Sequence, residues 1–156
     1  MKQLSIGVEA SVVLFCLWQA AGLLGEWENT PYLNYSLLAF FSWTIPLAIW
    51  LPKAIEIYGK PTCTLPFLFL GLLCSAFGML GSLNALKHIG LLFVLAAFLP
   101  VNFPFFIWAV SALAWLPAAA YFSRSFSILA VTVIRIAVAF IGLVAGLIAI
   151  NKKEKT

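Results

Sequence analysis

Three side chains within the apolar blocks of this chain could do chemistry: Glu9, Cys74 and Arg135. A thiolate is a nucleophile, but no base or cation lies close to Cys74 in sequence to activate it. A guanidinium binds a phosphate, carbonyl or carboxylate group through two parallel hydrogen bonds. Because a charge inside an apolar segment is costly, Glu9 and Arg135 are candidates for contact with a lipid or a partner. His88, the only histidine, is the third such candidate.

The residue inventory excludes several classes of active site. The chain has no aspartate, which removes aspartyl nucleophiles and aspartate-rich magnesium sites. A single histidine excludes bis-histidine haem ligation within this chain, and no glycine-rich phosphate loop, HExxH, GxSxG or CxxC motif occurs. We therefore predict no metal site and no cofactor of its own. A bound lipid, quinone or pigment stays open.

The elements that position these residues are membrane helices. Hydrophobic residues make up 64% of the 156 residues and charged residues 9%, and the mean hydropathy is +1.09, which excludes an ordinary soluble domain. A crossing needs about 20 helical residues. We predict a single integral membrane domain over residues 1–156, folded as an all-α, polytopic transmembrane bundle of about six short crossings.

The boundaries of the crossings are predicted from the polar and proline-containing breaks between the apolar blocks. Prolines bracket a basic loop at 52–61, and a polar patch occupies 82–88. The region 89–122 is too long for one crossing, and a proline-containing break at 100–104 divides it into two. The alternative is four crossings plus a re-entrant pair at 89–122. The other predicted crossings cover residues 4–24, 36–51, 62–81 and 126–150.

Lysine placement predicts the orientation, because short loops rich in Lys and Arg stay in the cytoplasm. With an even number of crossings, Lys87 and Arg124 lie on the outer side, so both termini are cytoplasmic, and we predict a prokaryotic inner membrane. The net charge of +4 is explained by cytoplasmic lysines that set the topology and lie beside anionic lipid headgroups. We therefore predict no nucleic-acid partner. The cytoplasmic lysines are Lys2, Lys53, Lys60, Lys152, Lys153 and Lys155.

Arg135 precedes Asn151 by about 16 residues, or about 24 Å of helix, which places it near the outer edge of the membrane. From there its side chain can reach outward to the headgroups. The sharper alternative is contact with a lipid phosphate, a substrate carbonyl or a carboxylate of a partner. Glu9 lies toward the opposite edge, where we expect it to reach headgroups.

Small residues mark faces where helices can approach closely in lipid. Gly142 and Gly146 form a GxxxG motif, and a second stripe contains Gly71, Ser75 and Gly78. We favour packing within the chain over packing between chains. Tryptophans near the ends of blocks, Trp27 and Trp50 among them, suit interfacial belts. Those at greater depth are expected to face lipid, with a pigment or a quinone as alternatives: Trp18, Trp43, Trp108 and Trp115.

The stretch 25–41, the sequence Trp50-Leu-Pro-Lys53 and the stretch 71–100 resemble the front part of the exosortase and archaeosortase family. The resemblance implies a membrane transpeptidase with a Cys, Arg and His triad at the outer face. Cys74 with Ser75 is similar to the family's cysteine motif, and Arg124 or Arg135 could stand for its arginine. No histidine follows the arginines, so the resemblance implies a shortened, non-catalytic relative.

Three functional hypotheses follow. The favoured one is a non-enzymatic accessory subunit or assembly factor, which docks onto other transmembrane subunits through its aromatic and small-residue faces. The second is an exosortase-like membrane cysteine transpeptidase. The third is a carrier for a lipid, a quinone or another apolar ligand, with the break at 100–104 as a gate. Membrane lipids are partners in all three.

Overall fold

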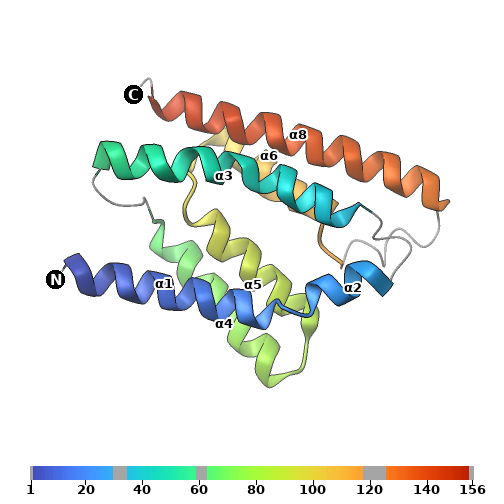
Figure 1. Ribbon diagram of the computed structural model, residues 1–156, viewed down its shortest axis with the longest axis horizontal. Coiled ribbons are helices and arrows are strands. Elements are labelled where there is room, and N and C mark those ends of the chain that lie inside the picture. Colours follow the sequence, from blue (N-terminus) through green and yellow to red (C-terminus); the bar gives the residue numbers. More distant parts are fainter. Residues whose placement is uncertain (1, 30–34, 59–62, 118–125, 155–156) are drawn as a thin grey trace. The chain divides into compact units, whose positions relative to one another are not determined.

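The computed structural model describes residues 2–29, 35–58, 63–117 and 126–154, which form helices and turns with no strand (Figure 1). This confirms the predicted all-α class for the described part of the chain. In chain order the elements are α1 (Lys2–Gln19), α2 (Leu23–Asn29), α3 (Ser36–Tyr58), α4 (Leu65–Leu80), α5 (Asn84–Ala96), α6 (Phe103–Val110), the 3₁₀ helix η2 (Ser111–Ala114) and α8 (Ile128–Glu154).

Within the described ranges, three helical segments are long and apolar enough to cross a membrane: Gly7–Asn29, Ser36–Tyr58 and Ile128–Asn151. The chain is therefore a candidate for membrane association. The other helices are shorter. With 16 and 13 residues, α4 and α5 extend about 24 and 20 Å, less than the hydrocarbon core of about 30 Å. The count of six crossings and the re-entrant alternative both stay predictions.

The described residues form two compact units. The first unit, Met1–Leu23 with Cys63–Phe98, contains α1, α4 and α5. The second unit, Leu24–Thr62 with Leu99–Thr156, contains α3, α6, η2 and α8. The predicted single domain over 1–156 stays a prediction.

In the first unit, α4 and α5 form an antiparallel pair whose backbones nearly touch (Figure 1). A Cβ atom at Gly71 would lie 2.9 Å from the carbonyl oxygen of Gly90, and one at Gly90 would lie 2.9 Å from the backbone nitrogen of Ser75. Only glycine permits this approach. At the open end of the pair, the N–H of Thr64 donates to the carbonyl of Ala97 at 2.8 Å.

Helix α1 packs against this pair through Cys16, which is fully buried beside Leu68 and Val94. The hydroxyl of Ser75 donates to the sulfur of Cys16 at 3.2 Å. The thiol of Cys16 in turn donates to the carbonyl of Gly71 at 3.8 Å, so Cys16 behaves as a small buried hydrophobe with two weak polar contacts.

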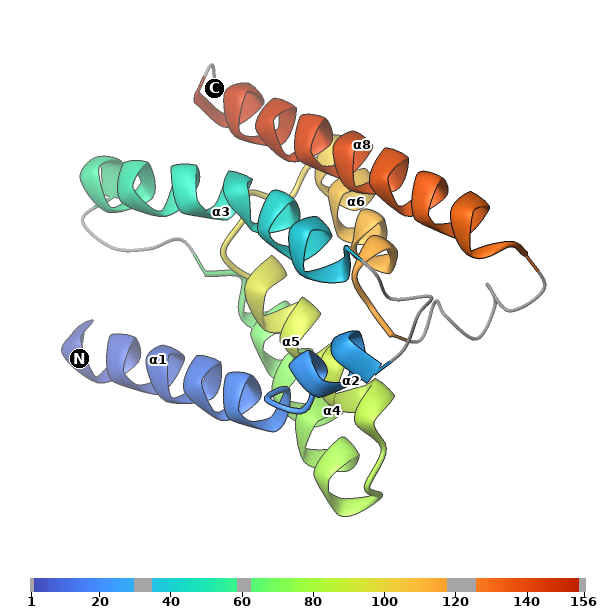
Figure 2. The same ribbon diagram turned by 45° about the vertical axis from the view of Figure 1, so that its right-hand side comes forward.

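In the second unit, α8 packs against α3 on one side and against α6 and η2 on the other (Figure 2). Two glycines of α8 allow side chains of neighbouring elements to approach closely. Gly142 faces Ser111, and Gly146 faces Pro46 and Trp108. The GxxxG motif is thus used inside this unit.

Two predicted breaks are wrong. The second crossing does not end before Pro52, because α3 continues to Tyr58 with Pro46 and Pro52 in its interior. A proline removes one backbone donor, but Trp50 and Ala54, one turn apart, are both buried on the same face and stabilise the helix across it. The polar patch at 82–88 is likewise mostly helical, since α5 begins at Asn84.

Candidate functional site

A tryptophan pair joins α3 to α6 at the centre of the second unit. The rings of Trp43 and Trp108 stack with centroids 4.1 Å apart and an interplanar angle of 11°. The indole N–H of Trp43 donates to the carbonyl of Trp108 at 2.8 Å, and the indole N–H of Trp108 donates to the carbonyl of Trp43 at 2.9 Å. Each residue is therefore both donor and acceptor in a closed pair of bonds.

Trp115 extends this cluster. Its ring meets Trp43 edge-on at 5.4 Å and Phe40 at 5.0 Å, and its carbonyl accepts a bond of 2.9 Å from the indole N–H of Trp27. Among the residues that the structure describes, none accepts a hydrogen bond from the indole N–H of Trp115.

The expectation that the deeper tryptophans face lipid is wrong for Trp43, Trp108 and Trp115, each 0% exposed. Trp18 alone is exposed, at 69%. The expected interfacial belts also fail for Trp27 and Trp50, which are buried. The physical reason is that the indoles of Trp27, Trp43, Trp108 and Trp115 gain aromatic contacts inside the unit. Those of Trp27, Trp43 and Trp108 also find carbonyl acceptors there.

Arg135 lies on α8, seven residues after the helix begins, and its side chain is only 6% exposed. Its guanidinium donates from Nη1 to the hydroxyl of Ser36 at 2.8 Å and from Nη2 to the carbonyl of Leu116 at 3.3 Å. The prediction that the side chain of Arg135 reaches outward to the headgroups is therefore wrong. Arg135 turns inward, where it links α8 to the start of α3 and to the residue that follows Trp115.

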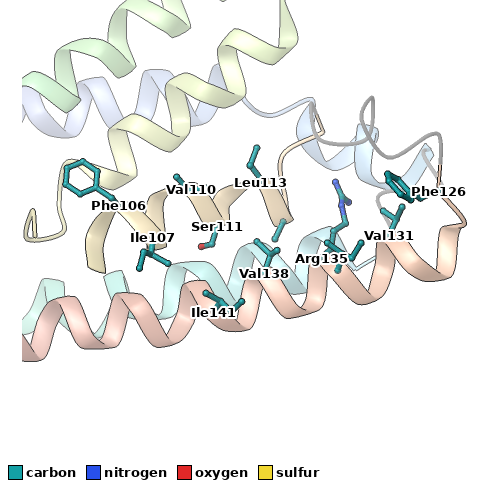
Figure 3. Close-up of a pocket in the computed structure, with 12 residues that line it drawn as sticks. Phe106, Ile107, Val110, Ser111, Leu113, Phe126, Val131, Arg135, Val138 and Ile141 are labelled. Carbon is teal, nitrogen blue, oxygen red and sulfur yellow. The ribbon is translucent and has the colours of Figure 1, made fainter. Parts of the chain in front are cut away.

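Beside Arg135, a groove of about 640 Å³ runs between α6 with η2 and the first half of α8 (Figure 3). Figure 3 shows Arg135 and Phe126 toward one end and Phe106 and Ile107 toward the other. All but two of its lining residues are apolar, the exceptions being Ser111 and Arg135. The lining residues are Phe106, Ile107, Val110, Ser111, Leu113, Ala114, Phe126, Val131, Ile134, Arg135, Val138 and Ile141.

Arg135 also lines a smaller hollow of about 140 Å³ between α3 and α8, which includes Tyr35 and Ser42. The guanidinium therefore stands at the boundary of two cavities within the same unit. Of the two, only the larger lies within the size range of typical small-molecule sites, about 300–1,000 Å³.

The remaining predicted site residues lie elsewhere. Cys74 is a half-buried free thiol on α4, His88 is 2% exposed on α5, and Glu9 is half-buried on α1, all in the first unit. Arg124 lies outside the described residues. Neither unit, as far as its residues are described, combines a cysteine with an arginine, so the implied triad is not assembled within either. The predicted lipid or partner contacts of Glu9 and His88 stay predictions.

The structure describes no cluster of three or more His, Cys, Asp or Glu side chains that could hold a metal ion, within the four ranges given above. What sequence reasoning missed is the groove itself and the hydroxyl of Ser36. Ser36 precedes Arg135 by 99 residues, and no spacing in the sequence connects them.

Comparisons with protein-family models, curated proteins and solved structures found no match to this chain. The resemblance to exosortases therefore stays a hypothesis based on the quoted residues.

Proposed function

We propose that this chain is a non-enzymatic integral membrane protein that binds an apolar-chain ligand in the groove between α6, η2 and α8. The supporting observation is a cavity of about 640 Å³ whose lining is apolar except for Ser111 and Arg135. Helix α8, which forms one wall, is apolar enough to span a membrane. In the hydrocarbon core of a membrane, the molecules available to fill such a groove are those with hydrocarbon chains.

This ligand-binding role has more support than the accessory-subunit hypothesis. That hypothesis relied on small-residue and aromatic faces being available for docking onto other subunits. Instead, Gly71 packs on α5, Gly146 packs on Pro46 and Trp108, and Trp43 is fully buried. The remaining exposed helix faces are apolar, and lipid covers such faces as well as another subunit does.

The transpeptidase hypothesis also has less support. All three cysteines, Cys16, Cys63 and Cys74, lie in the first unit, and the described residues of that unit include no arginine. A cysteine nucleophile needs a cation or a base within hydrogen-bond reach to form a thiolate.

For the membrane arrangement we keep the proposal of a bundle of about six crossings in a prokaryotic inner membrane, with both termini in the cytoplasm. The lysine distribution supports this arrangement, and the three apolar helical segments support membrane association itself. Of these lysines, Lys60 and Lys155 lie outside the described residues.

The experiment is to fill the groove and measure what the protein retains. Val110 lines the groove and is 64% exposed, so Val110→Trp adds bulk there without disturbing the buried cluster. The full chain is purified in mild detergent, and bound small molecules are detected by native mass spectrometry. We expect Val110→Trp to lower ligand occupancy about tenfold, which corresponds to about 1.4 kcal/mol of binding free energy.

The matched control is Leu129→Trp on α8, a position that is 78% exposed and does not line the groove. It should retain wild-type occupancy. If the two variants retain the same amount of ligand as the wild type, the groove is not the binding site and the proposal fails.

A further inference from the structure

We infer that the groove, whose ligand-binding role is the function proposed above, selects its ligand by chain length. It takes one straight hydrocarbon chain that reaches from the edge of the membrane to the middle of the bilayer, as the chain of a lipid in a single leaflet does. The selective feature is a closed end beside Phe106 and Ile107.

The two walls of the groove have nearly the same limited length. On α8 the lining residues extend from Val131 to Ile141, about 15 Å of helix. On the opposite wall they extend from Phe106 to Ala114, about 14 Å through α6 and η2. A hydrocarbon core of about 30 Å consists of two leaflets, so the chain of one lipid extends over about 15 Å. The groove therefore matches a chain of one leaflet, and a chain that crosses the whole core is about twice too long.

One end of the groove is closed, because α6 contacts α8 there. Ile141 is 54% exposed, whereas Ala145 and Ala149, the next positions on the same face of α8, are 6% and 0% exposed. At the start of α6, the side-chain amide of Asn102 donates to the carbonyl of Ala149 at 2.8 Å. Figure 3 shows Phe106 at this end of the groove. A chain in the groove has no room to continue beyond this point.

The opposite end of the groove lies at the start of α8. Phe126 lines this end, is 58% exposed and precedes Ile128, the first residue of α8 (Figure 3). The ends of a membrane-spanning helix lie near the lipid headgroups. A lipid chain therefore occupies the groove with its polar end beside Phe126 and its terminal methyl group toward Phe106.

The walls between these ends are stiff. Most of their aliphatic side chains are valine or isoleucine, whose branched Cβ atoms restrict them to few rotamers. Methionine side chains would adapt to ligands of different size, but none lines the groove. The groove therefore keeps its length when a longer chain is offered. These stiff side chains are Ile107, Val110, Val131, Ile134, Val138 and Ile141.

The experiment compares chain lengths on one headgroup. The full-length protein is stripped of lipid in mild detergent and offered equal amounts of lysophosphatidylcholines that carry a lauroyl, a palmitoyl or a lignoceroyl chain. Native mass spectrometry measures how much of each is retained. We expect the palmitoyl lipid, whose chain has the length of one leaflet, to be retained about tenfold over the longer lignoceroyl lipid. The shorter lauroyl lipid should also be retained less, because it leaves part of the groove unfilled.

Three variants assign the length limit to the closed end. Phe106→Ala removes the ring there and should lose the preference for palmitoyl over lignoceroyl. Ile107→Trp adds bulk at the same end and should shift retention from palmitoyl to lauroyl. The matched control is Phe103→Ala, which removes the same ring from α6 at a position that is 77% exposed and does not line the groove. It should keep the selectivity of the wild type. The comparison on the wild type decides whether a length limit exists even if a variant does not fold.

The outcomes separate this inference from the function on which it rests. Equal retention of palmitoyl and lignoceroyl lipids by the wild type overturns the length limit and leaves the groove as a binding site. Unchanged selectivity in both Phe106→Ala and Ile107→Trp, or altered selectivity in Phe103→Ala, overturns the assignment to the closed end. If the wild type retains none of the lipids, or if Val110→Trp retains all of them unchanged, the proposed function itself fails.

Discussion

The two units of this chain both bring helices together with small residues, but they fill the contacts differently. In the first unit, the backbones of α4 and α5 meet at Gly71 and Gly90, and the side chains of Ser75 and Cys16 add a weak polar contact. In the second unit, Gly146 of α8 admits two bulky neighbours, Pro46 and Trp108. Small residues can therefore serve two ends, either close backbone approach or accommodation of a large side chain.

This difference explains why the groove in the second unit has its form. A backbone-to-backbone contact closes the space between two helices. Helix α8 packs instead on the side chains of Ser111 and Trp108, which belong to η2 and α6. Helix α6 is short, with only eight residues, and passes directly into η2. The groove follows that short element, and Arg135 occupies one part of its wall.

The largest expected effect comes from removing the ring that holds the second unit. Trp108→Ala deletes the stacked partner of Trp43 and the bond to the carbonyl of Trp43, so we expect it to cost about 3–5 kcal/mol of unfolding free energy. The measurement is denaturant titration in detergent micelles, followed by tryptophan fluorescence. Trp18→Ala, at an exposed position, is the control and should change stability little. Equal losses in both variants would show that the pair is not central.

The next effect tests the backbone contact of the first unit. Gly90→Leu places a side chain against Ser75 and the carbonyl of Gly71, so overpacking should cost about 1–3 kcal/mol. Gly7→Leu lies in the same unit with nothing within 4 Å of its added Cβ and should be close to neutral. The same titration distinguishes them. A tolerated leucine at residue 90 would mean that α4 and α5 do not approach as closely as described.

The smallest effect separates hydrogen bonding from packing within the tryptophan cluster. Trp43→Phe keeps an aromatic ring but loses the N–H that bonds to Trp108, so it should cost about 1 kcal/mol more than Trp115→Phe. The N–H of Trp115 has no acceptor among the described residues, and its loss removes no bond. The comparison of the two unfolding free energies gives the result. A larger loss for Trp115→Phe would contradict the assigned bonds.

The sequence predicted the all-α class and the approximate location of the long helices, because apolar blocks between polar breaks are a direct signal. It failed at Pro52, where α3 continues through a residue that usually ends a helix, and over 84–88, where α5 has already begun. It also failed for Trp43 and Trp108. In a membrane, a side chain that faces lipid and one that faces another helix are equally apolar, so hydrophobicity alone does not separate them.

The candidate site was only partly predictable. Arg135 could be singled out from its charge, and the hypothesis of contact with a lipid phosphate could be framed at the same time. Its partner Ser36, 99 residues away, and the groove depend on how α3, α6 and α8 pack, which no local pattern encodes.

The reciprocal bonds between Trp43 and Trp108 have a mechanical consequence. Because each indole holds the other residue's backbone, α6 cannot slide along α3 by one helical turn, about 5.4 Å, without breaking both bonds and the ring stack together. The two hydrogen bonds and the ring stack therefore fix the register of α3 and α6 without any ligand. The wall that α6 contributes to the groove is therefore held in place by the protein's own contacts, so the proposed ligand binding would require little rearrangement there.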